Sequence, residues 1–381
     1  MTRVRDPRLD FFRGTGMFII FVAHLPNNGW AQWIPARFGF SDATEIFVFC
    51  SGMASAIAFG RVFEERGWAT GALRVLHRCW QVYWAQIGVF VAILALLSAV
   101  DRASGGSYYI DDLSLTAFFQ HTGAAMTGLV TLTYVPNYFD ILPMYLVILA
   151  LLPLVVALAR LSPAVAIGGV LACWAVAWTG RLDLPAEPWS ERSWFFNPFS
   201  WQIVFFAGFA FMRGWIPAPP VRRDLVWAAA AITVLTVPFA WHRGFFYVPV
   251  LGEWNAWLEP VIDKTHVGPL RFLHFLAIAY LAWLAAGPRG ARLRGWAADI
   301  VRRVGQQSLA VFLAGLVLAQ LGGVALDRLG RGDLAVAFVN LAGFAGLLGA
   351  AIIAEWFKSP PWRQPPRPAR HVELPGAAAA H

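Results

Sequence analysis

The chain carries little charge for its length. Only 14% of its 381 residues are Asp, Glu, Lys or Arg, only two are lysine, and 58% are hydrophobic. Because a soluble domain has about 25% charged residues, this composition excludes a soluble globular protein. The formal net charge of +8 is spread along the chain and does not gather on one soluble domain, so we predict no nucleic-acid partner.

Common motifs of soluble enzymes are missing as well. The sequence has no Walker loop, no dinucleotide glycine fingerprint, no serine elbow and no zinc-ligand spacing. We therefore predict no metal site and no permanently bound cofactor. The three cysteines, Cys50, Cys79 and Cys173, all fall in apolar segments and are interpreted as small buried hydrophobic residues.

Long apolar runs dominate what is present. A helix crosses a bilayer with roughly 17–25 such residues, and runs of that length recur ten times. We predict an all-α, polytopic integral membrane protein with about ten transmembrane helices. The segment 114–135 is helical in pattern but contains Gln120, His121 and many Gly and Thr residues, so we expect an interfacial or re-entrant helix there. The predicted spans lie near 10–27, 42–60, 76–99, 141–160, 164–180, 198–214, 224–241, 269–287, 304–326 and 334–356.

The distribution of charge predicts the orientation of these spans. With both termini cytoplasmic, most of the 30 Lys and Arg residues lie on the cytoplasmic side and most of the 22 Asp and Glu residues lie on the other, as the positive-inside rule requires. We predict one transmembrane domain over residues 1–357. Residues 358–381 are rich in Pro and Arg and are predicted to form a disordered cytoplasmic tail held at the lipid bilayer.

The first span contains ionisable residues that a lipid-facing helix should not have, namely Asp10, Arg13 and His24. Such groups are costly at membrane depth and mark function. Arg13 and His24 lie about 16 Å apart along a helix. His24 is a candidate general base near neutral pH, and Arg13 is a candidate anchor for phosphate or carboxylate. The alternative is a structural histidine with Arg13 reaching to the membrane interface.

The second span begins with Asp42 and Glu45, three residues apart on one face of its first turn. Capping of the helix alone would account for Asp42. Glu45 lies one turn deeper. Either carboxylate is also a candidate partner that orients His24, and both interpretations stay open at this point.

A basic cluster surrounds the cytoplasmic end of the third span. It contains Arg74, His77 and Arg78, and Arg61 precedes it. Such a cluster can bind the phosphates of a nucleotide-like donor, or it can be the topology signal alone.

The predicted outer segments 100–140, 181–198 and 242–270 mix Trp and Tyr with short polar side chains. This mixture is typical of the aromatic belt at a membrane interface, and also of a sugar-binding surface. His274, inside a later span, is a second candidate base. The candidate acceptor-binding residues are Asn137, Asp140, Trp201, Gln202, Lys264 and His266.

Several runs together resemble a known family. RLDFFRG, the arginine followed after ten residues by His24, and FSDATEIFVFCSG are similar to the membrane acyltransferase superfamily of the acyltransferase-3 type. The resemblance is closest to the OpgC-type family, which succinylates osmoregulated periplasmic glucans. YVPNYFDILPMYL, NPFSWQ, DKTHVGPLRFLHFLA and GQQSLAVF extend it over about residues 5–325. Asp10, Arg13 and His24 stand at the hallmark positions of the superfamily.

The resemblance implies acyl transfer in a bacterial inner membrane. The donor would be cytoplasmic acyl-coenzyme A, with succinyl-coenzyme A as co-substrate, and the acceptor a hydroxyl of a periplasmic glucan. His24 would take the hydroxyl proton, and Asp42 or Glu45 would hold its ring. Direct transfer and an acyl-enzyme on Ser51 or His24 both remain open, as does a homo-oligomer. The residues expected to bind the donor are Arg13, Ser51, Arg61, Arg74 and Arg78.

Two other functions fit parts of this pattern. A transporter or flippase of a glycan or solute would also use many spans and intramembrane charges, although the chain lacks the two-half repeat that many transporters have. The same chemistry could instead act on another envelope polysaccharide or use acetyl-coenzyme A.

Overall fold

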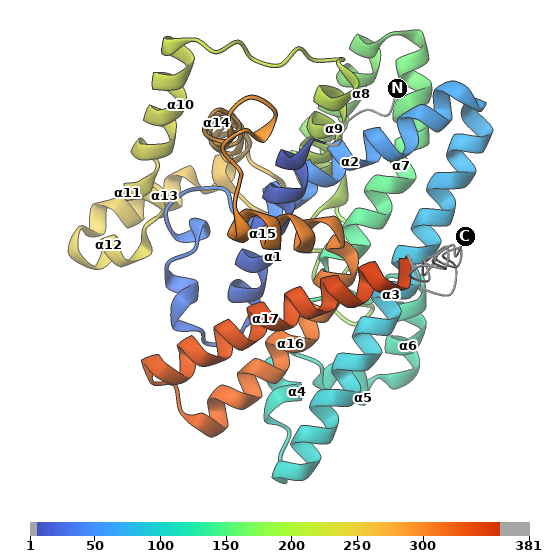
Figure 1. The fold of residues 1–381 in the computed structure, drawn as a ribbon. Helices are drawn as coiled ribbons and strands as arrows, with labels where there is room; N and C mark the ends of the chain where they lie inside the picture. The colour runs from blue at the N-terminus through green and yellow to red at the C-terminus, as the bar shows by residue number, and fades with distance from the viewer. Residues whose placement is uncertain (1–5, 359–381) are drawn as a thin grey trace, which may run out of the picture.

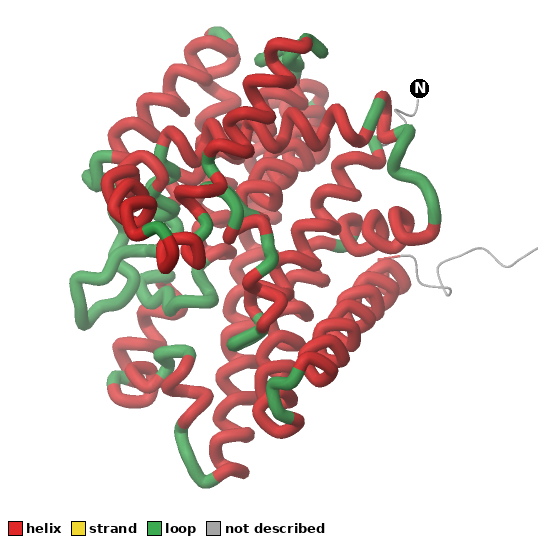
Figure 2. Tube along the Cα trace, turned by 90° about the vertical axis from the view of Figure 1, so that its left-hand side faces the viewer, coloured by secondary structure: helices red, strands yellow, loops and turns green. Residues whose placement is uncertain are grey.

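The computed structural model describes residues 6–358, and the predicted tail lies outside them apart from its first residue. Within this range the chain forms α-helices and short 3-10 turns, with no β-strand (Figure 2). The all-α prediction is therefore confirmed. The longer helices are α1 (Pro7–His24), α2 (Ala43–Glu65), α3 (Gly67–Ser104), α6 (Thr122–Thr131), α7 (Ile141–Leu161), α8 (Pro163–Trp178), α9 (Pro198–Arg213), α10 (Arg223–Leu235), α13 (Pro249–Ile262), α14 (Pro269–Ala286), α15 (Trp296–Gln306), α16 (Ser308–Leu329) and α17 (Asp333–Lys358).

Short helices connect these longer ones. They are α4 (Tyr108–Asp112), α5 (Thr116–Gln120), α11 (Val237–Ala240) and α12 (His242–Tyr247), with the 3-10 turns η1 (Gly29–Gln32), η2 (Pro35–Arg37) and η3 (Pro288–Gly290). The predicted interfacial or re-entrant segment 114–135 contains α5 and α6, which are separated at His121.

Among the described residues, seven helical stretches are long and apolar enough to cross a membrane, which agrees with a multi-pass membrane protein. They are Ala43–Glu65, Gly67–Ser104, Ile141–Leu161, Arg223–Ala240, Pro269–Ala286, Ser308–Leu329 and Asp333–Lys358. The other three predicted spans correspond to α1, α8 and α9. Helices α8 and α9 have only 16 residues each, and α1 carries several charges, so the total of ten spans stays a prediction.

Helix α1 lies at the centre of the molecule (Figure 1) and packs against α2, α15 and α16. Two glycines bring α1 and α15 unusually close. A Cβ at Gly14 would overlap the carbonyl group of Val301, and a Cβ at Gly305 would overlap the carbonyl oxygen of Asp10. Small residues allow such close backbone approach between membrane helices. The crossing buries the side chain of Asp10, which is 1% exposed, one turn before Arg13.

The loop after α1 is fastened to α17 by two buried asparagines. The Nδ2 of Asn28 donates to Oδ1 of Asn340 at 2.9 Å, and Nδ2 of Asn340 donates back to Oδ1 of Asn28 at 3.0 Å. The Asn28 amide also donates to the carbonyl oxygen of Val22, inside the last turn of α1. This pair therefore holds the carboxyl end of α1 in place.

We expect Asn340→Leu to lower the free energy of unfolding by about 1–3 kcal/mol, because it leaves the buried Asn28 amide without its partner. Thermal or chemical unfolding of the purified protein in detergent measures this change. Phe338→Leu, at a 66% exposed position of the same helix, is the control and should cost little. Equal stability of the two variants would contradict the proposed contribution.

Candidate active site

Helix α1 presents its two candidate groups at opposite ends of one face. The helix starts where Asp6 caps it, since the Asp6 side chain accepts from the Arg8 backbone N–H at 3.0 Å and Pro7 occupies the first turn. It ends at His24. At 3.6 residues per turn, eleven residues bring Arg13 and His24 to within about 20° of the same face, about 16 Å apart along the axis.

A cavity of about 630 Å³ opens at the Arg13 end of this face. Its lining residues all lie within the described part of the chain, and none of them is Asp or Glu. Three arginines, a histidine and a lysine make the lining basic, which suits an anionic ligand. The polar lining residues are Arg13, Ser51, Ser55, Arg74, His77, Arg78, Gln81, Tyr145, Gln306, Gln307, Ser308 and Lys358.

The ends of several helices meet at this cavity. The Arg13 guanidinium donates to Oγ of Ser308, the first residue of α16. The ammonium group of Lys358, the last residue of α17, donates to Oε1 of Gln307 at 2.5 Å. The break between α15 and α16 at Gln307 thus turns polar groups toward the cavity, in the middle of an otherwise apolar stretch.

Four of the five residues predicted to bind the donor line this cavity, namely Arg13, Ser51, Arg74 and Arg78. Arg61 does not. It lies on α2 and pairs with Glu65 one turn later at 3.2 Å, and 76% of its side chain is exposed. The structure gives Arg61 a surface ion pair, which the charge pattern could not distinguish from a cavity position.

His24 has a defined tautomer. Its Nδ1 lies 2.8 Å from the carbonyl oxygen of Ile20. A carbonyl oxygen only accepts hydrogen bonds, so Nδ1 of the neutral ring carries the proton and Nε2 carries the lone pair. The imidazole ring of His24 and the ring of Tyr138 also pack in an edge-to-face arrangement, with ring centroids 5.0 Å apart. His24 can therefore act as a base through Nε2.

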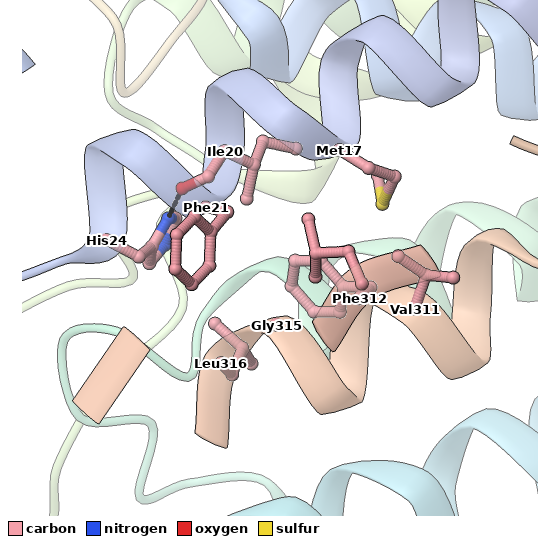
Figure 3. Close-up of a pocket in the computed structure, with 9 residues that line it drawn as sticks. Met17, Ile20, Phe21, His24, Val311, Phe312, Gly315 and Leu316 are labelled. Atoms are coloured by element: carbon pink, nitrogen blue, oxygen red, sulfur yellow. Dashed lines mark hydrogen bonds between the residues drawn. The ribbon is translucent and has the colours of Figure 1, made fainter. Parts of the chain in front are cut away.

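A second, much smaller cavity lies beside His24 between α1 and α16 (Figure 3). Its volume is about 10 Å³, which is room for about one water molecule. Apart from His24 the lining is apolar, and Figure 3 shows Met17, Phe312 and Leu316 closing the space between the two helices. The two ends of the α1 face are thus separated by a narrow apolar seam.

The two carboxylates at the start of α2 belong to a buried ion-pair network. Glu45 is fully buried and accepts from Nε of Arg271. Asp42 accepts from Nζ of Lys264 at 2.6 Å and from Arg271 at 3.2 Å. They also form a capping box, because Asp42 accepts from the Thr44 backbone and Glu45 accepts from the backbone N–H of Asp42 at 2.8 Å.

These contacts differ from the interpretation in which Asp42 or Glu45 holds the His24 ring. The hydrogen bond that orients His24 goes to the backbone of Ile20, whereas the carboxylates bind Arg271 and Lys264. The physical reason is that a buried carboxylate is costly unless a positive charge lies beside it, whereas a neutral imidazole ring is satisfied by a backbone carbonyl.

The predicted acceptor-binding residues divide into buried and accessible groups. Trp201 and Gln202 are buried, and their side chains donate to the carbonyl oxygens of Lys264 and Val170. They hold α9 against its neighbours and do not present a surface. Asn137 is exposed and accepts from Arg192 at 3.1 Å. Asp140, at the start of α7, is 8% exposed, and burial raises its pKa to about 6.

Lys264 and His266 lie in the loop between α13 and α14. The Lys264 ammonium group lies 5.4 Å from the centroid of the Phe196 ring. His266 is held between two carboxylates, with Nδ1 2.8 Å from Asp263 and Nε2 2.9 Å from Asp183. This arrangement ties the loop before α14 to the loop before α9.

Several residues of the site were not assigned a role from the sequence. Arg271 neutralises Glu45, Tyr138 packs on His24, and Gln307 and Ser308 meet Lys358 and Arg13. The consecutive polar residues at 306–308, inside a predicted span, are a signal that would have pointed to the cavity. His274 is buried, with Nδ1 2.8 Å from Oγ of Ser41.

Comparison with known protein families gave a match over nearly the whole chain. The family model described as OpgC protein matches residues 5–359, which includes α1, both cavities and the ion-pair network. Searches of the curated proteins and of the solved structures gave no significant match.

The His266 contacts predict a pH-dependent stability. Its hydrogen bonds to Asp263 and Asp183 raise its pKa to about 9, above the value of about 6.5 in an unfolded chain. The protonated form is therefore stabilised by folding, fully below about pH 6.5, and this contribution is lost as the pH rises toward 9.

We expect wild type to melt above His266→Gln at pH 6 and the two to converge by pH 10, as measured by thermal unfolding in detergent. His121→Gln, at an exposed histidine that stacks on Trp189, is the control. A difference between wild type and His266→Gln that does not change with pH would contradict this role.

Proposed function

We propose that this chain, which belongs to the OpgC protein family, transfers a succinyl group from succinyl-coenzyme A to hydroxyl groups of periplasmic glucans. Family membership indicates a glucan-modifying acyltransferase, and the apolar helices agree with a multi-pass membrane protein. The donor, the acceptor side and the base are the parts that this proposal adds. In it, the protein lies in the bacterial inner membrane with both termini in the cytoplasm.

The observation that carries the proposal is the basic cavity at the Arg13 end of α1. Coenzyme A is a polyanion, and arginine binds phosphate with several directed hydrogen bonds. A volume of about 630 Å³ lies within the range of about 300–1,000 Å³ typical of small-molecule sites. In this proposal the donor phosphates bind Arg74, His77 and Arg78, and the thioester arm points along α1 toward His24.

The chemistry follows from the His24 tautomer. Its Nε2 takes the proton of a glucan hydroxyl, whose oxygen attacks the thioester carbonyl carbon. The tetrahedral intermediate then releases the coenzyme A thiolate, which receives the proton from His24. This route needs no acyl-enzyme, and Ser51 serves as a contact of the donor cavity. Because the cavity beside His24 holds only about 10 Å³, donor binding has to widen the seam between α1 and α16.

The sidedness of the reaction rests on charge. The basic cavity coincides with the side to which the positive-inside rule assigns the cytoplasm, where acyl-coenzyme A is made. His24 and the loop that carries Lys264 then lie toward the periplasmic side. Exposed aromatic side chains such as Trp33 and Trp257 provide stacking surfaces for sugar rings there.

A thioester assay on the purified protein tests the proposal. We expect release of free coenzyme A from succinyl-coenzyme A only when glucan is present, together with a mass gain of one succinyl group on the glucan. Glucan movement across a proteoliposome without thioester consumption would instead support a transporter. Turnover with acetyl-coenzyme A or with another polysaccharide alone would change the assigned donor or acceptor.

Arg78→Ala is expected to raise the apparent KM for the donor tenfold or more, because a charge-assisted hydrogen bond to phosphate contributes about 1.5–3 kcal/mol. Steady-state kinetics with varied succinyl-coenzyme A measure the change. Arg61→Ala is the matched control, since it removes an arginine that lies outside the cavity. Equal effects of the two substitutions would mean that Arg78 contributes only to topology.

His24→Ala is expected to lower kcat by about 10²–10⁴-fold, the usual contribution of a general base, while donor binding in the larger cavity is retained. Binding of coenzyme A by calorimetry and transfer activity are measured on the same preparation. If His24→Ala turns over at a near-normal rate, the base lies elsewhere, and His274→Ala becomes the next variant to test.

A further inference from the structure

Gln320 on α16 is a buried amide with an unused donor. Its side chain is 3% exposed, and Nε2 has no hydrogen-bond partner. Buried polar groups are normally satisfied, and an unsatisfied one calls for a functional reason or a ligand. None of the roles assigned above uses this group.

The packing of α1 on α16 places Gln320 at the level of His24. Arg13 meets Ser308 at one end of the pair, and Leu25 and Pro26 pack over Gly322 and Gly323 at the other. The two helices therefore run in the same direction with a nearly constant register. His24, one residue before Leu25, lies opposite the turn of α16 that carries Gln320.

Tyr138 connects the two side chains. Its ring packs on His24, with centroids 5.0 Å apart, and its hydroxyl donates to the carbonyl oxygen of Leu316 at 2.7 Å. The Gln320 amide approaches this hydroxyl closely enough to interact with it, although no acceptor lies in hydrogen-bonding geometry with Nε2. Tyr138 also has a φ of +82°, a backbone conformation that is unfavourable for an aromatic residue and that recurs at functional sites.

We propose that Gln320 is a catalytic residue that stabilises the oxyanion of the transfer reaction, and that Tyr138 positions it and His24. This inference rests on the proposed function. As the glucan oxygen bonds to the thioester carbon, the carbonyl π electrons move to its oxygen, and His24 takes the hydroxyl proton. The Nε2–H of Gln320 donates to that oxygen. When the C–S bond breaks, the electrons return to the carbonyl and the thiolate takes the proton from His24.

A neutral amide is suited to this position. Preorganised donors in a site that excludes water stabilise developing charge without reorganisation. An amide provides such a donor and adds no net charge to the apolar seam. This role also explains why Nε2 of Gln320 lacks a hydrogen-bond partner in the structure, because its acceptor is the thioester oxygen, which arrives with the donor.

The test compares two buried glutamines. In Gln320→Leu we expect kcat to fall about 10²–10³-fold, as on loss of one oxyanion donor, with KM for succinyl-coenzyme A within twofold of wild type. The melting temperature should be unchanged or higher, because an unsatisfied polar group is removed. Gln202→Leu, which loses a satisfied bond to Val170, should show the opposite pattern, with a lower melting temperature and retained kcat.

Gln320→Met, which keeps the volume of the side chain, repeats the measurement if the leucine variant is not recovered. A kcat within threefold of wild type overturns the inference. So does an unchanged kcat with a raised KM for glucan, which would make Gln320 a contact of the acceptor. A wild-type protein that releases no coenzyme A fails the proposed function itself, whereas active wild type with fully active Gln320→Leu fails only this inference.

Discussion

The buried ion pair between Glu45 and Arg271 is the constraint on which the packing of α2, α9 and α14 depends. Glu45 is fully buried, and an unpaired charge in that environment would be prohibitively costly. Arg271 satisfies it and reaches Asp42 as well, and Lys264 completes the neutral set. Removal of one partner of a buried ion pair lowers the stability of the fold by more than the net contribution of the pair, because it leaves the other charge buried and unpaired. The ion pairs of Arg271 with Glu45 and Asp42 fasten the start of α2 to α14. The pair of Lys264 with Asp42 fixes the loop that precedes α14. That loop in turn supplies the carbonyl oxygen to which the buried Trp201 donates, so α9 depends on the same network.

Local sequence signals predicted a large part of this arrangement. Composition and apolar runs were sufficient for the all-α membrane architecture, because helix is the structure that satisfies every backbone group in lipid. The helical period was sufficient for Arg13 and His24 to share a face. Clustered basic residues predicted positions around the larger cavity, since Arg74 and Arg78 are one turn apart and lie on one side of α3. In each case the information is contained within a few turns of one helix.

Other features depend on contacts between distant parts of the chain, and no local pattern contains them. Arg271 meets Glu45 across 226 positions of sequence, so the partner of that carboxylate could not be read from its neighbours. Arg61 and Arg78 look alike as basic residues near a membrane boundary, but only one of them faces the cavity. Trp201 stands in an aromatic, polar motif typical of a sugar site, yet it is buried, donates to Lys264 in the loop before α14 and packs on the ring of Phe196. Long-range packing is therefore the step at which single-sequence reasoning ends.

The choice of a backbone carbonyl as the partner of His24 has a chemical consequence. A carboxylate in the same place would raise the basicity of the ring, but it would also set a fixed negative charge beside the proposed transfer site. The proposed succinyl donor carries its own carboxylate, and two anions in an apolar seam would repel each other strongly. The carbonyl of Ile20 holds the same tautomer without that charge. The carboxylates Asp42 and Glu45 are instead neutralised by Arg271 and Lys264, so their charges are compensated near the site. This arrangement suits an anionic acyl group better than a carboxylate–histidine pair would, and it makes the tautomer of His24 a property of α1 itself.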